Sequence, residues 1–323
     1  MKQDSSKVIK KDTSDAKFIK DNLHKLVRDL SSEKYHGLFG TWSSSQFKDM
    51  LEDEELFIKK YVKKEIPRVE REVFDTGTYF HTCVLEPHKI KSEIAIYQGK
   101  IRRGKEWDAF KAKHPGKTII SKIQQEQGDL MVKAVKGSPV AQEYLEGEPE
   151  VSLFVELHIW QGKIYSKKFE KVLTINGWEN CPKPFVDKGY KIIVKVRADT
   201  LGETFVSDLK STSANARIDG SIRNSISNYK YDLSAALYLD MFNLINPSVR
   251  EFIWIFASKE ARNCATWRAS RNNILVGRAK YMKAMVKLAD CAQANWELVD
   301  CLREAEPMPY EMEWLRQRDT DLL

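Results

Sequence analysis

The order of apolar and polar positions predicts a helical N-terminal part. From Asp15 to Leu30 the apolar residues recur at helical spacing, which predicts a helix capped by Ser14 or Asp15. The same spacing predicts helices over 46–64, 78–87 and 117–146, the last divided in two at Gly137. Residues 1–14 are polar and lysine-rich, which is typical of a poorly ordered tail.

The pattern then changes to that of a sheet. Alternating or continuous apolar runs with β-branched residues predict strands over 151–160, 163–175, 190–198 and 204–212. FIWIFA at 252–257 is apolar on both faces, as expected of a buried central strand. Helical spacing returns at 226–246 and at about 271–303.

No repeat or linker divides this pattern, so it predicts one mixed α/β domain. We expect the domain to span 15–315, with a mainly helical portion at 15–147 and the catalytic sheet with its flanking helices at 148–303.

Composition narrows the class of protein. A chain of 323 residues with 42% hydrophobic content can bury a large core without disulfides. Its longest apolar runs are far shorter than the roughly 20 residues of a membrane-spanning helix, and no apolar segment follows the charged N-terminus. We therefore expect a cytoplasmic protein with no membrane partner. Five cysteines without a CxxC pair argue for reduced thiols and against a zinc or iron–sulfur cluster, while a net charge of +7 favours anionic partners.

The stretch VRADTLGETFVSDLKST at 196–212 carries the clearest chemical pattern. Two predicted strands flank the tight turn TLGE, so the hairpin brings Asp199 near Asp208 on the return strand. Side chains two apart on a strand share a face, so Asp208 and Lys210 project together while Leu209 faces the core. Two carboxylates and a lysine are therefore expected to converge.

This trio suits magnesium-dependent hydrolysis of a phosphodiester. Mg²⁺ prefers oxygen ligands, and a bound metal neutralises the phosphate and lowers the pKa of its water. Lys210 could orient that water or stabilise the developing charge, or, if deprotonated, take the proton of the water. An Asp-x-Lys on a strand is by itself more often a surface ion pair worth about 0–1 kcal/mol. The trio alone leaves both interpretations open.

The chain resembles the exodeoxyribonuclease VIII (RecE-like) branch of the PD-(D/E)XK nucleases over roughly 35–303. Blocks that occur in the order of that family are GTYFHTCVLEP (77–87), RRGKEWDAFKAKHPGKTI (102–119), EPEVSLF (148–154), and 196–212 followed by NYKYDLSAALYLDMF (228–242). Each block is weak alone, and their joint order and spacing are specific. The resemblance implies an α/β fold with a PD-(D/E)XK nuclease core, a mixed central sheet flanked by helices, and an N-terminal helical portion.

The resemblance also implies roles for the catalytic residues. Asp199 and Asp208 would ligate the metal with help from the backbone carbonyl of Leu209, and Lys210 would act on the water. His81 would complete the metal site, although the sequence alone favours a satisfied histidine on an apolar helix.

An acidic residue before the first core strand would add to this site. Glu150 matches it and could hold a second metal or its waters, with Glu148 and Glu143 as nearby competitors.

A further set of residues is expected to contact DNA. Its members are Arg197, Thr212, Arg217, Arg223, Tyr229 and Tyr238. Surface charge for the arginines and buried packing for Tyr229 are the alternatives. Relatives carry a glutamine four residues before the tyrosine of this helix, and here Ser234 and Tyr238 have that spacing, which puts the usual contact with substrate in doubt. The insertion at 176–189 predicts an exposed loop that touches DNA or a neighbouring subunit.

The resemblance implies a metal-dependent exonuclease that degrades one strand of duplex DNA from its end, 5′ to 3′, and leaves a single strand for recombination. It implies Mg²⁺, with Mn²⁺ as a substitute, a ring-like homo-oligomer, a RecT-type annealing partner and a phage or prophage source. One alternative is a Cas4-like or helicase-associated nuclease, or an endonuclease of the same fold, although the first two commonly need four cysteines at a spacing absent here. Another is a catalytically inactive DNA-binding protein, against which retention of the whole trio argues.

Overall fold

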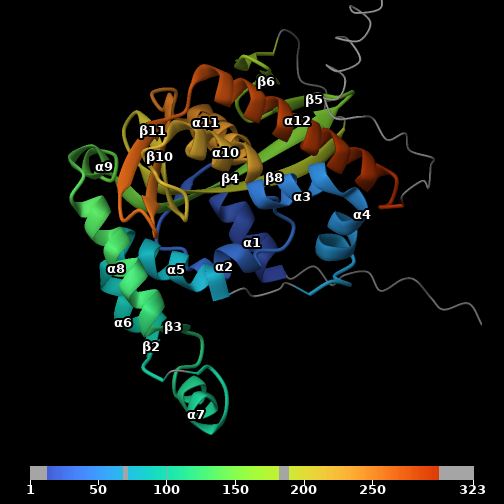
Figure 1. The fold of residues 1–323 in the computed structure, drawn as a ribbon. Helices are drawn as coiled ribbons and strands as arrows, with labels where there is room; N and C mark the ends of the chain where they lie inside the picture. Colours follow the sequence, from blue (N-terminus) through green and yellow to red (C-terminus); the bar gives the residue numbers. More distant parts are fainter. Residues whose placement is uncertain (1–12, 68–71, 100, 182–188, 298–323) are drawn as a thin grey trace, which may run out of the picture.

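The computed structural model describes residues 13–67, 72–99, 101–181 and 189–297 (Figure 1). A nine-stranded sheet forms its centre, in the order β11-β10-β9-β8-β4-β5-β6-β7, with β1 pairing against β4. The strands are β1 (Leu26–Val27), β4 (Glu148–Trp160), β5 (Lys163–Ser166), β6 (Lys171–Thr174), β7 (Gly177–Asn180), β8 (Tyr190–Leu201), β9 (Phe205–Thr212), β10 (Glu251–Ser258) and β11 (Cys264–Arg268). Neighbouring strands are antiparallel except β9 and β10, which run parallel.

One face of the sheet is covered by three helices. Because parallel strands need a crossover, α10 (Asp219–Asn228) and α11 (Tyr231–Ile245) connect β9 to β10, and α11 packs on the sheet with α3 (Ser44–Glu52) and α12 (Arg271–Gln293). The largest hydrophobic cluster lies here and includes Trp254 and Phe256 of β10.

The opposite face is covered by α5 (Glu72–Leu85), α8 (Lys122–Lys136) and α9 (Pro139–Glu143). Phe80 of α5 packs there in one cluster with Ile253 and Ile255 of β10. Alternate residues of β10 thus enter two cores, which confirms FIWIFA as a buried central strand. Each fully buried large apolar side chain of this kind contributes about 1.5–3 kcal/mol.

An arm extends from this second helical layer (Figure 1). It contains a small parallel sheet of β2 (Ile94–Tyr97) and β3 (Thr118–Ser121), with α7 (Lys105–Lys113) at its tip. The short elements η2 (Pro87–Lys89) and α6 (Ile90–Glu93) lead into it from α5.

The N-terminal helix is shorter than its periodicity predicts. α1 (Thr13–Asn22) ends well before Leu30, because His24 takes a left-handed φ of 60° and donates its backbone N–H to Phe154 of β4 at 2.7 Å. The chain then forms β1, so the apolar residues beyond Asn22 pack against the sheet and not along a helix. Pairing with β4 overrides local helical spacing here.

Other segments differ from the sequence pattern in detail. The stretch 46–64 divides into α3, α4 (Glu54–Phe57) and the π-helix η1 (Ile58–Val62), and α2 (Ser32–Gly37) precedes them. The stretch 163–175 is two strands, β5 and β6, and the insertion at 176–189 begins with β7 at the sheet edge, while 182–188 lie outside the described residues.

The architecture confirms the predicted fold class, a mixed α/β fold with a central sheet flanked by helices. Within the described residues, no helix is both long enough and apolar enough to span a membrane.

Candidate active site

The sheet opens between β8 and β9 immediately after the turn that joins them. Thr200 pairs with Ser207 and Leu201 with Val206, and these are the pairs that join the two described strands. Beyond them the carboxylate of Asp199 accepts the backbone N–H of Leu209 at 2.7 Å. A side chain thus satisfies a backbone donor that the ladder leaves free, and Asp199 is fixed at the opening.

Glu150 reaches the same point from the neighbouring strand. Pro149 pairs with Thr200 and Val151 with Ala198, so the register of β4 and β8 puts Glu150 opposite Asp199. The backbone of Glu150 has a left-handed φ of 54°. That conformation costs a non-glycine residue roughly 1–2 kcal/mol, and such strain is characteristic of functional sites.

His81 completes this group from α5, on the other side of the opening. Its Nδ1 lies 3.6 Å from Oδ2 of Asp199. One ligand atom from each of His81, Glu150 and Asp199 lies within 4.8 Å of the other two. The opened sheet edge therefore brings together two carboxylates and an imidazole from three separate elements.

Asp208 and Lys210 approach from the face that α11 covers. They pair with Trp254 and Phe256 of β10, whose side chains belong to that core. The Lys210 ammonium lies 2.5 Å from Oδ1 of Asp208. Asp208 is 5% exposed, and its Oδ2 has no hydrogen-bond partner among the described residues.

The acids of the site are short of positive charge. Burial, followed by repulsion from Asp199, raises the pKa of Glu150 to about 8, although Arg197 opposes the change. Burial also raises the pKa values of Asp199 and Asp208, even though Lys210 lowers both. A cation in this group would offset the cost of burying these carboxylates.

The imidazole is ready to act as a ligand. Burial and the nearby Lys210 charge lower the pKa of His81 to about 4, so the ring is neutral at pH 7. Carboxylate oxygens are donors for hard divalent metals such as Mg²⁺ and Mn²⁺, and neutral imidazole is a donor for transition-metal ions. The orphaned oxygen of Asp208 and the donor set of His81, Glu150 and Asp199 fit a divalent cation.

Lys210 is a charged group in this arrangement. Although burial alone would lower its pKa, the carboxylates of Asp208 and Asp199 raise that pKa above its usual value. The ammonium form is therefore retained at neutral pH. Of the two roles that the sequence left open, the geometry favours orienting water or stabilising negative charge over taking a proton.

A known protein family matches most of the chain. Residues 43–303 match the family described as a PDDEXK-like domain of unknown function (DUF3799). The chain belongs to this family. The family match and the opened sheet that carries Asp199, Asp208 and Lys210 together support a nuclease. The narrower RecE-like branch stays a prediction.

Other comparisons show little. No curated protein sequence matches the chain. A crystal structure named "Putative exonuclease" from Eubacterium rectale is 14% identical, with a TM-score of 0.49, over 86% of this chain and 97% of that one. The structure of SSO0001 is 13% identical, with a TM-score of 0.23, over 74% of this chain and 84% of the other. Likeness at this level does not bear on function.

Some residues predicted to bind DNA have other contacts within the protein. Arg197 donates to Oγ of Ser152 at 2.9 Å, to the carbonyl of Leu30 at 2.6 Å and to Glu150 at 3.3 Å, and it stacks over Tyr35. Arg197 therefore supports Glu150 from inside the protein. These contacts do not favour a role of Arg197 in binding phosphate.

Tyr238 and Thr212 also have partners inside the protein. Burial raises the pKa of Tyr238 to about 12, and a hydrogen bond links its hydroxyl to Ser44. Oγ1 of Thr212 accepts the backbone N–H of Ala214 at 3.1 Å. Neither contact tests the predicted role in DNA binding.

The remaining predicted contacts lie at the surface. Tyr229 is 62% exposed and its ring stacks on Tyr231, while Arg223 pairs with Asp219 at 2.8 Å. Arg217 is exposed, and its Nε lies 3.5 Å from the carbonyl oxygen of Cys264. These positions are available to a large ligand, and their role stays a prediction.

Lys48 of α3 is a residue that the sequence reasoning missed. Its ammonium lies 5.3 Å from the centroid of the Tyr231 ring, and its pKa responds to the charges of Lys210 and Asp208. No motif surrounds Lys48, and only the packing of α3 against α11 brings it to the site.

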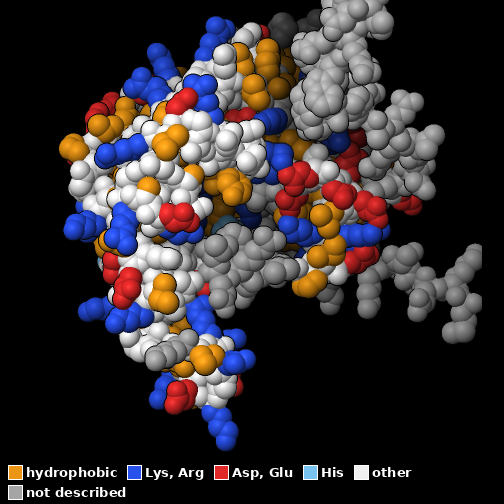
Figure 2. All heavy atoms as spheres, viewed as in Figure 1, with side chains coloured by type: hydrophobic (Ala, Val, Ile, Leu, Met, Phe, Trp, Pro, Cys, Tyr) orange, Lys and Arg blue, Asp and Glu red, His pale blue; other side chains and the backbone are white. Residues whose placement is uncertain are grey.

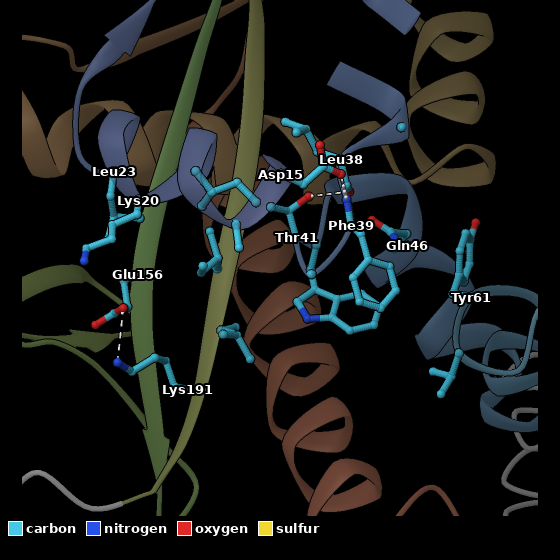
Figure 3. A pocket seen from close by; sticks show the side chains of 18 of the residues that line it. Asp15, Lys20, Leu23, Leu38, Phe39, Thr41, Gln46, Tyr61, Glu156 and Lys191 are labelled. Carbon is cyan, nitrogen blue, oxygen red and sulfur yellow. Dashed lines mark hydrogen bonds and ion pairs between the residues drawn. The ribbon is translucent and has the colours of Figure 1, made fainter. Parts of the chain in front are cut away.

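A cavity among the described residues lies elsewhere. It has a volume of about 790 Å³ and is lined by α1, the loop at 36–42, η1 and the start of β8. Figure 3 shows the Lys191–Glu156 ion pair on one side of it and Phe39 with Tyr61 on the other. None of the predicted site residues lines this cavity, so it is separate from the metal-ligating group.

Proposed function

We propose that the protein is a divalent-metal-dependent nuclease that hydrolyses phosphodiester bonds of DNA. The convergence of Glu150, Asp199 and His81 with the Asp208–Lys210 pair at the sheet opening carries this proposal. A divalent cation held there would supply charge neutralisation at the phosphate and a water of lowered pKa.

The residues of the chain divide the remaining work. Asp199, Glu150 and His81 would hold the ion, and the Oδ2 of Asp208, which has no hydrogen-bond partner among the described residues, would be a further donor. Lys210 keeps its proton because of the neighbouring carboxylates, so its ammonium can donate to a phosphate oxygen as negative charge develops. Arg197 keeps Glu150 in place by a hydrogen bond.

An inactive DNA-binding protein is less consistent with this site. Three carboxylates that are buried or largely buried and have raised pKa values reduce stability, and a protein that only binds DNA gains nothing from that cost. The presence of these carboxylates together with Lys210 favours a catalytic function.

The proposed substrate is the end of duplex DNA, and the proposed product is a single strand for recombination. The four sequence blocks and the net charge of +7 support this choice. A 5′ to 3′ direction, Mg²⁺ with Mn²⁺ as substitute, a ring-like oligomer and a RecT-type partner are further parts of the proposal, supported by the RecE-like resemblance.

The test compares linear with covalently closed circular duplex DNA, in Mg²⁺ and in chelator. We expect linear DNA to be digested only in Mg²⁺, with closed circles left intact. Digestion of closed circles would show an endonuclease, and digestion in chelator would rule out the proposed metal site. The Asp199→Asn variant serves as the inactive reference.

A further inference from the structure

Helices α3 and α11 lie antiparallel beside the candidate active site, and a stripe of α3 faces α11. Ser44, Lys48 and Glu52 are spaced four residues apart and so share one face of α3. Ser44 contacts Tyr238 near the middle of α11, and Glu52 forms an ion pair with Lys230 just before α11 begins. Lys48 lies between these contacts, which fix its position where α3 packs against α11.

Tyr231 places Lys48 near the catalytic lysine. The ammonium of Lys48 lies 5.3 Å from the centroid of the Tyr231 ring, and the ammonium of Lys210 lies 5.4 Å from the same centroid. The two cations are thus separated by no more than these distances combined. A phosphodiester strand that reaches Lys210 can therefore also reach Lys48.

Lys48 has no anionic partner among the described residues. The acids whose charges reach it are Asp208 and Asp232, and both are paired with other lysines. Asp208 pairs with Lys210 at 2.5 Å, and Asp232 pairs with Lys280 at 2.6 Å.

Neighbouring lysines of the N-terminal helices differ from Lys48 in this respect. Lys60 pairs with Asp49 and Lys59 with Glu55, each at 2.5 Å. Burial and the positive charge of Lys210 also lower the pKa of Lys48 to about 8, which is the effect of a cation without a counter-charge. The Lys48 ammonium is thus half-buried at the edge of the site and has no anionic partner among the described residues.

We propose that Lys48 binds a non-bridging oxygen of the DNA backbone, at the phosphate next to the scissile one, and so positions the strand over Lys210. This inference rests on the proposed nuclease function. The phosphate would supply the missing counter-charge, since lysine binds phosphate as a compact point charge. Lys48 is then a positioning residue, because the reacting phosphate itself lies at Lys210 and the metal-ligating group.

The first experiment measures kcat and KM of Lys48→Met on linear duplex DNA in Mg²⁺. A charged hydrogen bond of this kind corresponds to a loss of about 10- to 100-fold in kcat/KM. We expect most of the loss in KM, a salt dependence of binding weaker by a slope of about 0.9, and partial recovery in Lys48→Arg. Lys59→Met is the matched control, because Lys59 pairs with Glu55 and its pKa responds to no charge of the candidate site.

The second experiment identifies the phosphate. Duplexes carry one neutral methylphosphonate, placed in turn at the positions around the cleaved bond. At the contacted position the wild-type protein should lose activity to the level of Lys48→Met, and the variant should lose nothing more. Lys48→Gln is expected to give the same result, so a folding defect peculiar to methionine does not decide the outcome.

The outcomes separate the two proposals. The role of Lys48 is overturned if the wild-type protein cleaves DNA and both Lys48→Met and Lys48→Gln behave like Lys59→Met. The proposed nuclease function would stand in that case. Equal extra losses for variant and wild type at every methylphosphonate position would also overturn it. A wild-type protein inactive on all DNA would overturn the nuclease function and this role with it.

Discussion

Replacement of Glu150 by glutamine should change how the stability of the metal-free protein depends on pH. Burial and repulsion from Asp199 raise the pKa of Glu150 from 4.5 to about 8. A carboxyl with a raised pKa in the folded state contributes stability that is fully present below pH 4.5 and is lost as pH rises through about 8. Glutamine keeps nearly the same shape but does not ionise.

The size of the effect follows from that pKa. One proton that is bound in the folded state and absent in the unfolded state changes stability by about 1.4 kcal/mol per pH unit. The Glu150 side chain is 21% exposed, so solvent screens it little. Between pH 6 and pH 8 we expect the metal-free wild-type protein to lose about 2–3 kcal/mol. Glu150→Gln should lose clearly less.

Urea denaturation at pH 6, 7 and 8 in chelator measures this difference. Glu148→Gln is the control, because Glu148 lies on the same strand, is half exposed, and has a pKa that a hydrogen bond with Arg28 lowers. That control should keep the wild-type slope. Adding Mg²⁺ at pH 8 should stabilise the wild-type protein and stabilise Glu150→Gln much less.

Two results would refute this reasoning. A metal-free wild-type protein equally stable at pH 6 and pH 8 would show that Glu150 is not held with a raised pKa. A slope that persists unchanged in Glu150→Gln would assign the proton to another group. After either result, the raised pKa of Glu150 would no longer be an argument for a metal at this site.

Two further substitutions test the site and its support. Asp208→Asn should reduce Mg²⁺-dependent digestion of linear duplex DNA by at least about 100-fold with an unchanged circular dichroism spectrum, and near-normal digestion would remove Asp208 from the mechanism. Asp240→Ala should lower the free energy of unfolding by about 3–5 kcal/mol, because Asp240 is the buried partner of Arg278 and accepts a hydrogen bond from Tyr281 at 2.5 Å. Urea denaturation measures that loss, and a change below about 1 kcal/mol would contradict a stabilising role of Asp240.

Parts of the site follow from local sequence. The alternation of β9 sets Asp208 and Lys210 on one face with Leu209 on the other, and the short turn at 202–204 brings Asp199 opposite Asp208. Period-two alternation and a tight turn act over a few residues, so the chain itself contains enough information to predict these neighbours.

Other parts of the site come from distant segments. His81 lies on α5 and Lys48 on α3, and neither has a local motif that indicates the site. The sequence resemblance alone pointed to His81, and nothing pointed to Lys48. Their positions depend on how the helices pack on the two faces of the sheet, which local periodicity does not determine.

The sequence by itself thus determined the strands β4, β8, β9 and β10, the hairpin and the acid–acid–lysine trio, because each depends on neighbours in the chain. Only the tertiary structure decided the charge states. The charges of Asp208 and Asp199 keep Lys210 protonated against the effect of burial, and burial with repulsion from Asp199 raises the pKa of Glu150. The physical reason is that ionisation depends on desolvation and on charges from other elements, and both arise when the sheet and its helices come together.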